Sequence, residues 1–219
     1  MKVVVAFGGS LISAEEPESI KKVGKVLDKC TRDIGIYIIV GGGKTSRKYI
    51  GAARFLGADE KFLDEMGIAV TRLNAMLIKA SLKDETPVPK TVEEAAGMRT
   101  PVIMGGTIPG HSTDTVGAML AREIKADRFV IATDVDGIYD KDPKKNPTAK
   151  KYDSISIKEL REMVPNKWDM AGKNSVVDGI ACKIIDEEKM PTYVVNGRNL
   201  ELLENAIYGR EFKGTRIEV

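Results

Sequence analysis

The chain has 219 residues, with 34 Lys or Arg against 32 Asp or Glu, so its formal net charge at pH 7 is only +2. Dedicated nucleic-acid-binding proteins usually carry a clear excess of basic residues, and this balance argues against that class. No stretch approaches the roughly 18 apolar residues that a membrane-spanning helix needs, so we expect a soluble, cytoplasmic protein.

Short apolar runs recur along the chain between longer amphipathic segments. Five of these runs lack polar alternation, which is typical of parallel strands covered by helices on both faces. The predicted strands are Val3–Phe7, Ile36–Val40, Pro101–Met104, Phe129–Ala132 and Thr192–Val195. The final segment, Gly214–Val219, alternates apolar and polar residues and is interpreted as an edge strand.

Amphipathic periodicity between the strands predicts helices. They are expected at Ser19–Thr31, Ser46–Phe55, Lys61–Leu82, Thr115–Ile124, Ser156–Met163, Ser175–Glu188 and Leu200–Ile207. Alternating strands and helices form βαβ units, which build a mostly parallel sheet. The sequence therefore predicts an α/β fold.

Three glycine clusters directly follow predicted strands: Gly8-Gly9-Ser10, Gly41-Gly42-Gly43-Lys44 and Gly105-Gly106-Thr107. Ligands of parallel sheets bind beyond the carboxyl ends of the strands, and glycine lets the backbone approach a ligand closely. Each cluster alone is more typical of a tight turn than of a ligand site, but together they predict a site for several phosphates. Neither the Walker A spacing nor GxGxxG is present, which disfavours P-loop NTPases and dinucleotide-binding enzymes.

The third cluster continues to residue 114 as GGTIPGHSTD. Ser112, Thr113 and Asp114 stand where a helix should begin, which suits an N-cap followed by an acidic first turn. The same hydroxyl and N–H groups also suit a bound phosphate, and both roles can hold together. His111 is the chain's only histidine. We interpret it as a substrate contact or a spectator rather than a general base.

The segment Thr133–Tyr139 (TDVDGIY) follows a predicted strand and leads to Asp142 in a lysine-rich loop. Its DVDG fragment is similar to the start of a calcium loop but lacks the later ligands, so we reject a calcium site. Thr133 and Tyr139 could instead cradle adenine and ribose, and Asp142 could orient magnesium or a ribose hydroxyl. Elsewhere, Cys30 and Cys182 have no metal-ligand spacing, which predicts two reduced thiols.

In this order, GGS, GGGK, MGGTIPGHSTD and TDVDGIYDKDP resemble the motifs of the amino acid kinase family and, within it, of UMP kinases of archaeal type. The resemblance runs from residue 3 to the C-terminal GTRIE. It implies a three-layer α/β/α sandwich with a mostly parallel central sheet in a single domain. The N-terminal lobe, about 1–125, would bind the phosphoryl acceptor, and the C-terminal lobe, about 126–219, would bind ATP.

The resemblance also implies the site residues. The ATP-binding residues would be Gly9, Ser10, Gly43, Arg47, Thr133, Tyr139 and Asp142. The UMP-binding residues would be Gly42, Asp64, Thr107, Ile108, Pro109, Gly110, His111, Ser112 and Thr113. A carboxylate such as Asp64 accepts hydrogen bonds from ribose hydroxyls well. Mg²⁺ would be held mainly by the ATP phosphates, without a metal site made by the protein.

The phosphate of UMP is already an ionised nucleophile, so catalysis should consist of aligning two anions and neutralising their repulsion. Arg47 would reach the transferring group, and Asp114 would organise the phosphoryl site or a metal-bound water. Many family members carry a lysine two residues before the first glycine pair, where this chain has Ala6. Lys44 and Lys183 are the candidates for the catalytic cation that replaces it.

The resemblance further implies a homohexamer and inhibition by UTP. The apolar excess of Lys61–Leu82 fits either a subunit contact or a deeply buried helix. One alternative function is another kinase of the fold, acting on isopentenyl phosphate or an amino acid; an isoprenoid acceptor would need an apolar tunnel. The other is a non-catalytic nucleotide sensor, which Ala6 alone favours.

Overall fold

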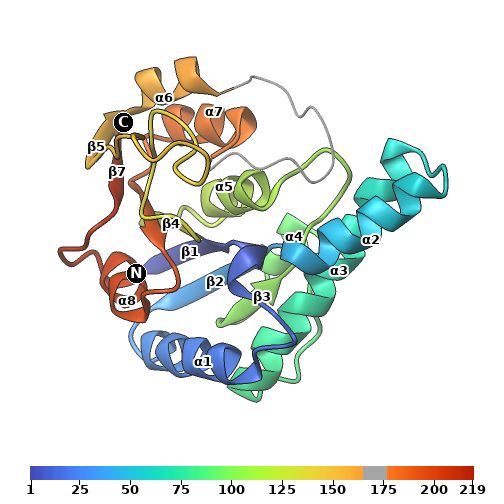
Figure 1. Cartoon of the computed structure of the whole chain (residues 1–219). Coiled ribbons are helices and arrows are strands. Elements are labelled where there is room, and N and C mark those ends of the chain that lie inside the picture. The colour runs from blue at the N-terminus through green and yellow to red at the C-terminus, as the bar shows by residue number, and fades with distance from the viewer. Residues whose placement is uncertain (165–176) are drawn as a thin grey trace.

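The computed structural model describes residues 1–164 and 177–219, in which a seven-stranded sheet carries helices on both faces (Figure 1). The strands are β1 (Lys2–Phe7), β2 (Gly35–Val40), β3 (Val102–Met104), β4 (Arg128–Thr133), β5 (Ser154–Ser156), β6 (Thr192–Asn196) and β7 (Thr215–Glu218). Their order across the sheet is β3-β2-β1-β4-β6-β7-β5. Every neighbouring pair is parallel except β6 and β7.

The helices form the two outer layers. They are α1 (Pro17–Thr31), α2 (Gly43–Phe55), α3 (Glu60–Leu82), α4 (Val92–Ala96), α5 (Thr113–Glu123), α6 (Ile157–Met163), α7 (Gly179–Glu187) and α8 (Leu200–Tyr208). In Figure 1, α1 and α8 lie on one side of the sheet and α5, α6 and α7 on the other. The predicted three-layer α/β/α sandwich is confirmed. Residues 175 and 176 of one predicted helix lie outside the described ranges. Over the described residues, none of the helices is both long and apolar enough to cross a membrane.

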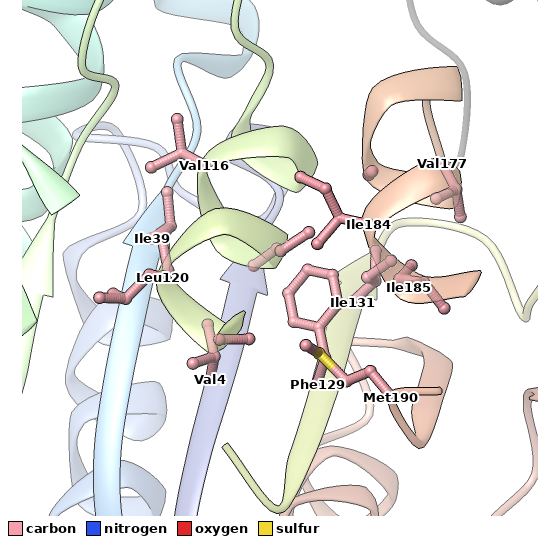
Figure 2. Packing of buried hydrophobic residues seen from close by; sticks show 14 of the residues in the cluster. Val4, Ile39, Val116, Leu120, Phe129, Ile131, Val177, Ile184, Ile185 and Met190 are labelled. Atoms are coloured by element: carbon pink, nitrogen blue, oxygen red, sulfur yellow. The ribbon is translucent and has the colours of Figure 1, made fainter. Parts of the chain in front are cut away.

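The central strand β1 supplies both hydrophobic cores because successive strand side chains point to opposite faces. Val4 and Ala6 belong to the core under α5 and α7, while Val3 and Phe7 belong to the core under α1 and α8. Figure 2 shows the first core, in which Phe129 of β4 packs with residues from β1, α5 and α7. Burial on both faces explains why these strands read as continuous apolar runs.

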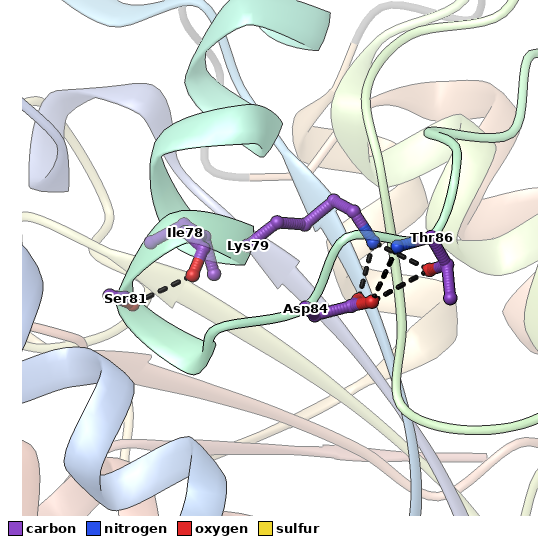
Figure 3. A network of polar contacts seen from close by, with 5 residues as sticks. All are labelled: Ile78, Lys79, Ser81, Asp84 and Thr86. Carbon is purple, nitrogen blue, oxygen red and sulfur yellow. Dashed lines mark hydrogen bonds and ion pairs between the residues drawn. The ribbon is translucent and has the colours of Figure 1, made fainter.

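The end of the long helix α3 is fixed by a buried ion pair (Figure 3). The side chain of Lys79 is only 6% exposed, and it contacts the Asp84 carboxylate and Thr86 Oγ1, the latter at 2.8 Å. Thr86 N also donates to Asp84 Oδ1 at 2.9 Å. Burial would raise the pKa of Asp84, but these hydrogen bonds hold it below its usual value. Because the pair is satisfied by further hydrogen bonds, it orders the chain where α3 ends.

The prediction that Gly214–Val219 forms an edge strand is wrong. The strand β7 lies between β6 and β5, antiparallel to the first and parallel to the second. The strand β5 beside it has three residues and a single buried one, Ile155, which is too short for an alternation signal. The alternation of β7 therefore reflects one buried and one exposed face, not an edge position. The five-residue helix α4 was also not predicted, for the same reason of length.

Candidate active site

A cleft of about 600 Å³ opens where β1, β2 and β4 end. Ligands of parallel sheets bind at this edge. Its walls come from several regions of the chain. They are the loops Gly8–Ser10 and Gly41–Gly43, helices α2 and α3, residues 106 and 108–114, residues 131–135 and 138–144 at and after the end of β4, the end of α6, and the start of α7. The cleft therefore joins segments from both predicted lobes.

The first two glycine loops touch backbone to backbone in the floor of the cleft. A Cβ on Gly9 would lie 2.6 Å from the carbonyl oxygen of Gly41 and would overlap the amide nitrogen of Gly43. Gly43 has a φ of +61°, and a Cβ there would overlap the carbonyl of Gly9. Because the obstacle in each case is main chain, it cannot move aside as a side chain could. These positions require glycine, and the surfaces they offer to a ligand are backbone.

Helix α3 holds the glycine loops in place. Asn74 Nδ2 donates to Gly41 O at 2.8 Å and to Gly42 O at 3.2 Å. Thr71 Oγ1 accepts from Gly106 N at 2.7 Å. These contacts satisfy loop backbone groups that have no strand partner. Sequence reasoning missed both residues, although two polar side chains inside an apolar helix segment were a signal that could have found them.

The neighbouring residue Arg72 extends this support along the third glycine loop. Its Nε donates to Gly106 O at 3.2 Å and its Nη2 to Thr107 O at 3.1 Å. Closer to the cleft, Asp64 Oδ2 accepts from Gly110 N at 2.9 Å. Asp64 is half-buried, and its Oδ1 has no protein partner within the ranges described. The carboxylate thus positions the loop while keeping one oxygen for a ligand.

Ser112 is the N-cap of α5, which confirms that prediction. Its Oγ accepts from Asp114 N at 3.1 Å and from Thr115 N at 3.0 Å, and it donates to the carboxylate of Asp178. Asp178 is in turn the N-cap of α7 and accepts from Ile180 N at 2.8 Å. The two helix starts are therefore tied together at the cleft.

Asp114 lines the cleft in the first turn of α5. Burial, and then the negative charge of Asp178, raise the pKa of Asp114 well above its ordinary value. A carboxyl group perturbed in this way inside a cleft is typical of a functional site. Beside it, His111 lines the cleft, and its Nδ1 is buried without a hydrogen-bond partner among the described residues.

The opposite wall of the cleft is largely apolar. It includes Ile138, Leu160, Met163, Val164, Val177 and Ile180. Thr133, Tyr139 and Asp142 border this wall, and Asp142 Oδ1 accepts from Lys144 N at 2.9 Å. A flat apolar surface beside hydroxyl and carboxylate groups suits a nucleobase with its ribose. Nothing in the sequence of α6 distinguishes these side chains from ordinary core residues, so the wall was not predicted.

Most of the predicted site residues meet in this one cleft. Every predicted ATP-binding residue lines it, and so does every predicted UMP-binding residue except Thr107. Of the predicted catalytic residues, Arg47 and Asp114 line it, whereas Lys44 and Lys183 do not. Lys44 is exposed in the first turn of α2. The Lys183 side chain is 65% exposed, and its Nζ lies 3.8 Å from Oε1 of Glu187.

Ala6 does not line the cleft either. It is 1% exposed, and a Cβ on Gly117 of α5 would lie 3.5 Å from its methyl group. The ring of Phe129 packs against the same glycine. The position where related kinases carry a lysine is therefore closed by apolar packing, and the cleft must draw its positive charge from another element.

Comparison with known proteins agrees with this geometry. The profile of the amino acid kinase family matches residues 1–196. The uridylate kinase of Archaeoglobus fulgidus is 45% identical over 201 residues, covering 90% of this chain and 91% of that protein. The uridylate kinase of Thermococcus kodakarensis is 42% identical over an alignment of 226 residues that covers both chains completely. The crystal structure of the A. fulgidus uridylate kinase superposes with a TM-score of 0.88 at 43% identity, covering 99% of this chain and 100% of that one.

Substituting Gly9 tests the contact between the two glycine loops. We expect Gly9→Ala to lower the free energy of unfolding by about 1–3 kcal/mol and to abolish binding of a non-hydrolysable ATP analogue, because the added methyl group forces the loops apart. Gly51→Ala in α2 is the matched control, since its Cβ would meet nothing within 4 Å. It should bind like the wild type and gain up to about 1 kcal/mol. Urea unfolding measures the free energy of unfolding of each variant, and calorimetric titration measures its binding of the ATP analogue. Unchanged binding by Gly9→Ala would contradict the expectation.

Proposed function

The chain belongs to the amino acid kinase family, and from this premise we propose that it is a UMP kinase, which transfers the γ-phosphoryl group of MgATP to UMP and forms UDP in pyrimidine nucleotide biosynthesis. The observation that carries the proposal is the cleft, where backbone donors, Asp64 and residues 108–114 line one cavity. Two uridylate kinases match this chain over 90% or more of its length. Nothing in these comparisons favours another acceptor.

The two substrates would divide the cleft between its two walls. ATP would place its phosphates on Gly9, Ser10 and Gly43, its base on the apolar wall, and its ribose near Thr133, Tyr139 and Asp142. UMP would lie on Gly42 and along residues 107–113, with its ribose at the free Oδ1 of Asp64. This arrangement brings the two phosphates together over the glycine loops. In this arrangement the residues before about 125 hold UMP and the ATP phosphates, and the residues after about 125 hold the base and ribose of ATP.

Catalysis then consists of holding two anions in line and offsetting their repulsion. The backbone N–H groups of the glycine loops supply fixed donors that need no reorganisation. Arg47 supplies full positive charge: it lines the cleft, is exposed, and forms no ion pair within residues 1–164 and 177–219. A guanidinium group contacts phosphate oxygens through two donors at once, which suits the transferring group.

We propose that Mg²⁺ enters the cleft with ATP. The described residues contain no group of three or more His, Cys, Asp or Glu side chains that could hold a metal ion by themselves. Asp114 is a carboxyl group inside the cleft and fits a role in holding the hydration shell of the ion. When bound, Mg²⁺ would neutralise part of the negative charge of the phosphates.

An apolar surface supports the proposed homohexamer. Large apolar side chains are more than half exposed on α2, α3 and the turn between them, namely Tyr49, Phe55, Leu56, Phe62, Leu73 and Met76. Surfaces of this kind mark protein contacts. UTP, which shares its uridine with UMP, is proposed as an inhibitor that competes for the acceptor wall. Two buried, unpaired thiols, Cys30 and Cys182, fit a cytoplasmic location.

A panel of acceptors tests the proposed function. The purified protein is incubated with MgATP and, in parallel, UMP, CMP, dUMP, AMP, GMP, isopentenyl phosphate, aspartate or acetylglutamate, and ADP release is measured. We expect strong turnover with UMP. Preference for isopentenyl phosphate or an amino acid would keep the fold and replace the function. ATP binding without turnover on any acceptor would identify a nucleotide sensor.

Alanine substitutions test the source of the catalytic charge. Arg47→Ala should lower kcat for UMP by about 10²–10³-fold, the loss typical of one well-placed donor to a transition state. Lys44→Ala and Lys183→Ala serve as comparisons measured in the same assay. A loss like that of Arg47→Ala would place the substituted lysine in the reaction, while near wild-type kcat would exclude it. Wild-type activity in Arg47→Ala would overturn the role of the guanidinium.

Sedimentation velocity tests the assembly. The wild type should sediment as a species with six times the 23.9 kDa mass of the chain. The double variant Leu73→Glu/Met76→Glu should give smaller species, because two charges on the apolar surface oppose its burial. Val219→Glu alters an exposed apolar residue outside that surface and should leave the assembly intact. A monomeric wild type would contradict the hexamer.

A further inference from the structure

The carboxylate of Asp178 collects donors from two helices. Its Oδ1 accepts from Ile180 N at 2.8 Å and Ala181 N at 2.9 Å, which caps α7. Its Oδ2 accepts from the hydroxyl of Ser112, at the start of α5. Thr115 Oγ1 lies within hydrogen-bonding distance of both oxygens, at 2.8 and 2.9 Å. Capping α7 requires only the two amide contacts, from Ile180 N and Ala181 N. The contacts of Asp178 with Ser112 and Thr115 therefore need another explanation.

We propose that Asp178 is a positioning residue for phosphoryl transfer, which ties the start of α5 to the start of α7 and so sets the spacing between the two walls of the cleft. The α5 side carries residues 108–114, and the α7 side continues the apolar wall through Val177 and Ile180. The reaction named here rests on the proposed function, whereas the tie itself is a property of the folded chain.

The hydrogen-bonding capacity of Ser112 supports this role. Its hydroxyl has one proton and two lone pairs. The lone pairs accept from Asp114 N and Thr115 N, and the proton is donated to Asp178. No capacity remains for a substrate, so Ser112 links the helices instead of binding phosphate through its side chain. The hydroxyl of Thr113 is the one left for a ligand, and it lies 3.2 Å from where a Cβ on Gly41 would stand.

The charge of Asp178 supports the same conclusion. A carboxylate that is partly removed from water is costly unless its oxygens are well satisfied, and donors from two elements satisfy the half-buried Asp178. Asp178 also lies near Asp114, the carboxyl group whose pKa is raised partly by that charge. A negative charge beside an anion-binding cleft opposes substrate binding. Asp178 lines the cleft, but donors from α5 and α7 occupy both of its oxygens. This arrangement fits a structural link between the two helices and not a ligand contact.

The substitution Asp178→Asn separates the tie from the cap. The remaining oxygen still accepts from the α7 amides, because asparagine is a good N-cap. The new amide group can only donate, and Ser112 has no lone pair left to accept from it, so the link through Ser112 is broken. Only the hydroxyl of Thr115, 2.8 Å from Oδ1, still joins α5 to the retained oxygen. We expect kcat with UMP to fall about 10²-fold, as for a small misplacement of reacting groups, with KM for ATP within about twofold of wild type.

Amide hydrogen exchange reports on the tie without depending on turnover. In Asp178→Asn, exchange should accelerate in residues 108–116 and stay unchanged in 179–187. Asp178→Ala should accelerate both segments. The matched control is Asp59→Asn, the same chemical change at the exposed N-cap of α3, where Phe62 N is the one donor to the carboxylate among residues 1–164 and 177–219. It should alter neither kcat nor exchange in these segments.

Each result decides between the alternatives. Wild-type kcat in Asp178→Asn, or exchange that accelerates only in 179–187, would overturn the positioning role and leave a simple helix cap. A fall in kcat without faster exchange in 108–116 would overturn it as well. A wild-type protein that does not phosphorylate UMP would contradict the proposed function instead, and the exchange data would still test the tie.

Discussion

The cleft depends on the direct contact between two backbones, at Gly9 and at Gly41 to Gly43. Main chain from β1 and β2 can come this close only where neither side has a Cβ atom. The contact turns two strand ends into one floor of amide and carbonyl groups. It also places the start of α2, with its unsatisfied N–H groups, at the edge of that floor. A phosphate-binding surface thus arises from sheet geometry and the absence of side chains, with little specialised chemistry.

Helix α3 makes that floor rigid. Thr71, Arg72 and Asn74 satisfy carbonyl and amide groups of two glycine loops, and Asp64 holds the loop at Gly110. Without these contacts the loops would carry unpaired backbone groups and many accessible conformations. The helix is itself secured at its far end by the buried pair of Lys79 and Asp84. The long helix α3 therefore packs in the core and also fixes the positions of the loops that form the site.

The charged residues at the cleft have two different functions, since Arg47 is available to a ligand and Asp178 holds two helices in place. Arg47 lines the cleft without an ion pair in the described part of the chain, so it is available to an anion. The carboxylate of Asp178 is occupied by donors from α5 and α7. Position 6, closed by Gly117 and Phe129, contributes packing and no charge. The positive charge that lines the cleft therefore comes from Arg47 in α2 and from Lys141 and Lys144 in the loop after β4, and not from the central strand.

The sequence by itself determined the α/β class, six of the strands and most of the helices, because buried parallel strands and amphipathic helices leave strong local patterns. It also identified the glycine loops, and most of the site residues it predicted line the cleft. The three-residue strand β5 and the position of β7 depended on tertiary pairing, since a single buried residue, Ile155, carries no periodicity. The same holds for the roles of Thr71, Asn74 and Asp178, and for the exclusion of Lys44 and Lys183 from the cleft lining. Which way a helical side chain points, and which distant backbone group it meets, is decided only when the layers pack, because those partners lie 32 or more residues away along the chain.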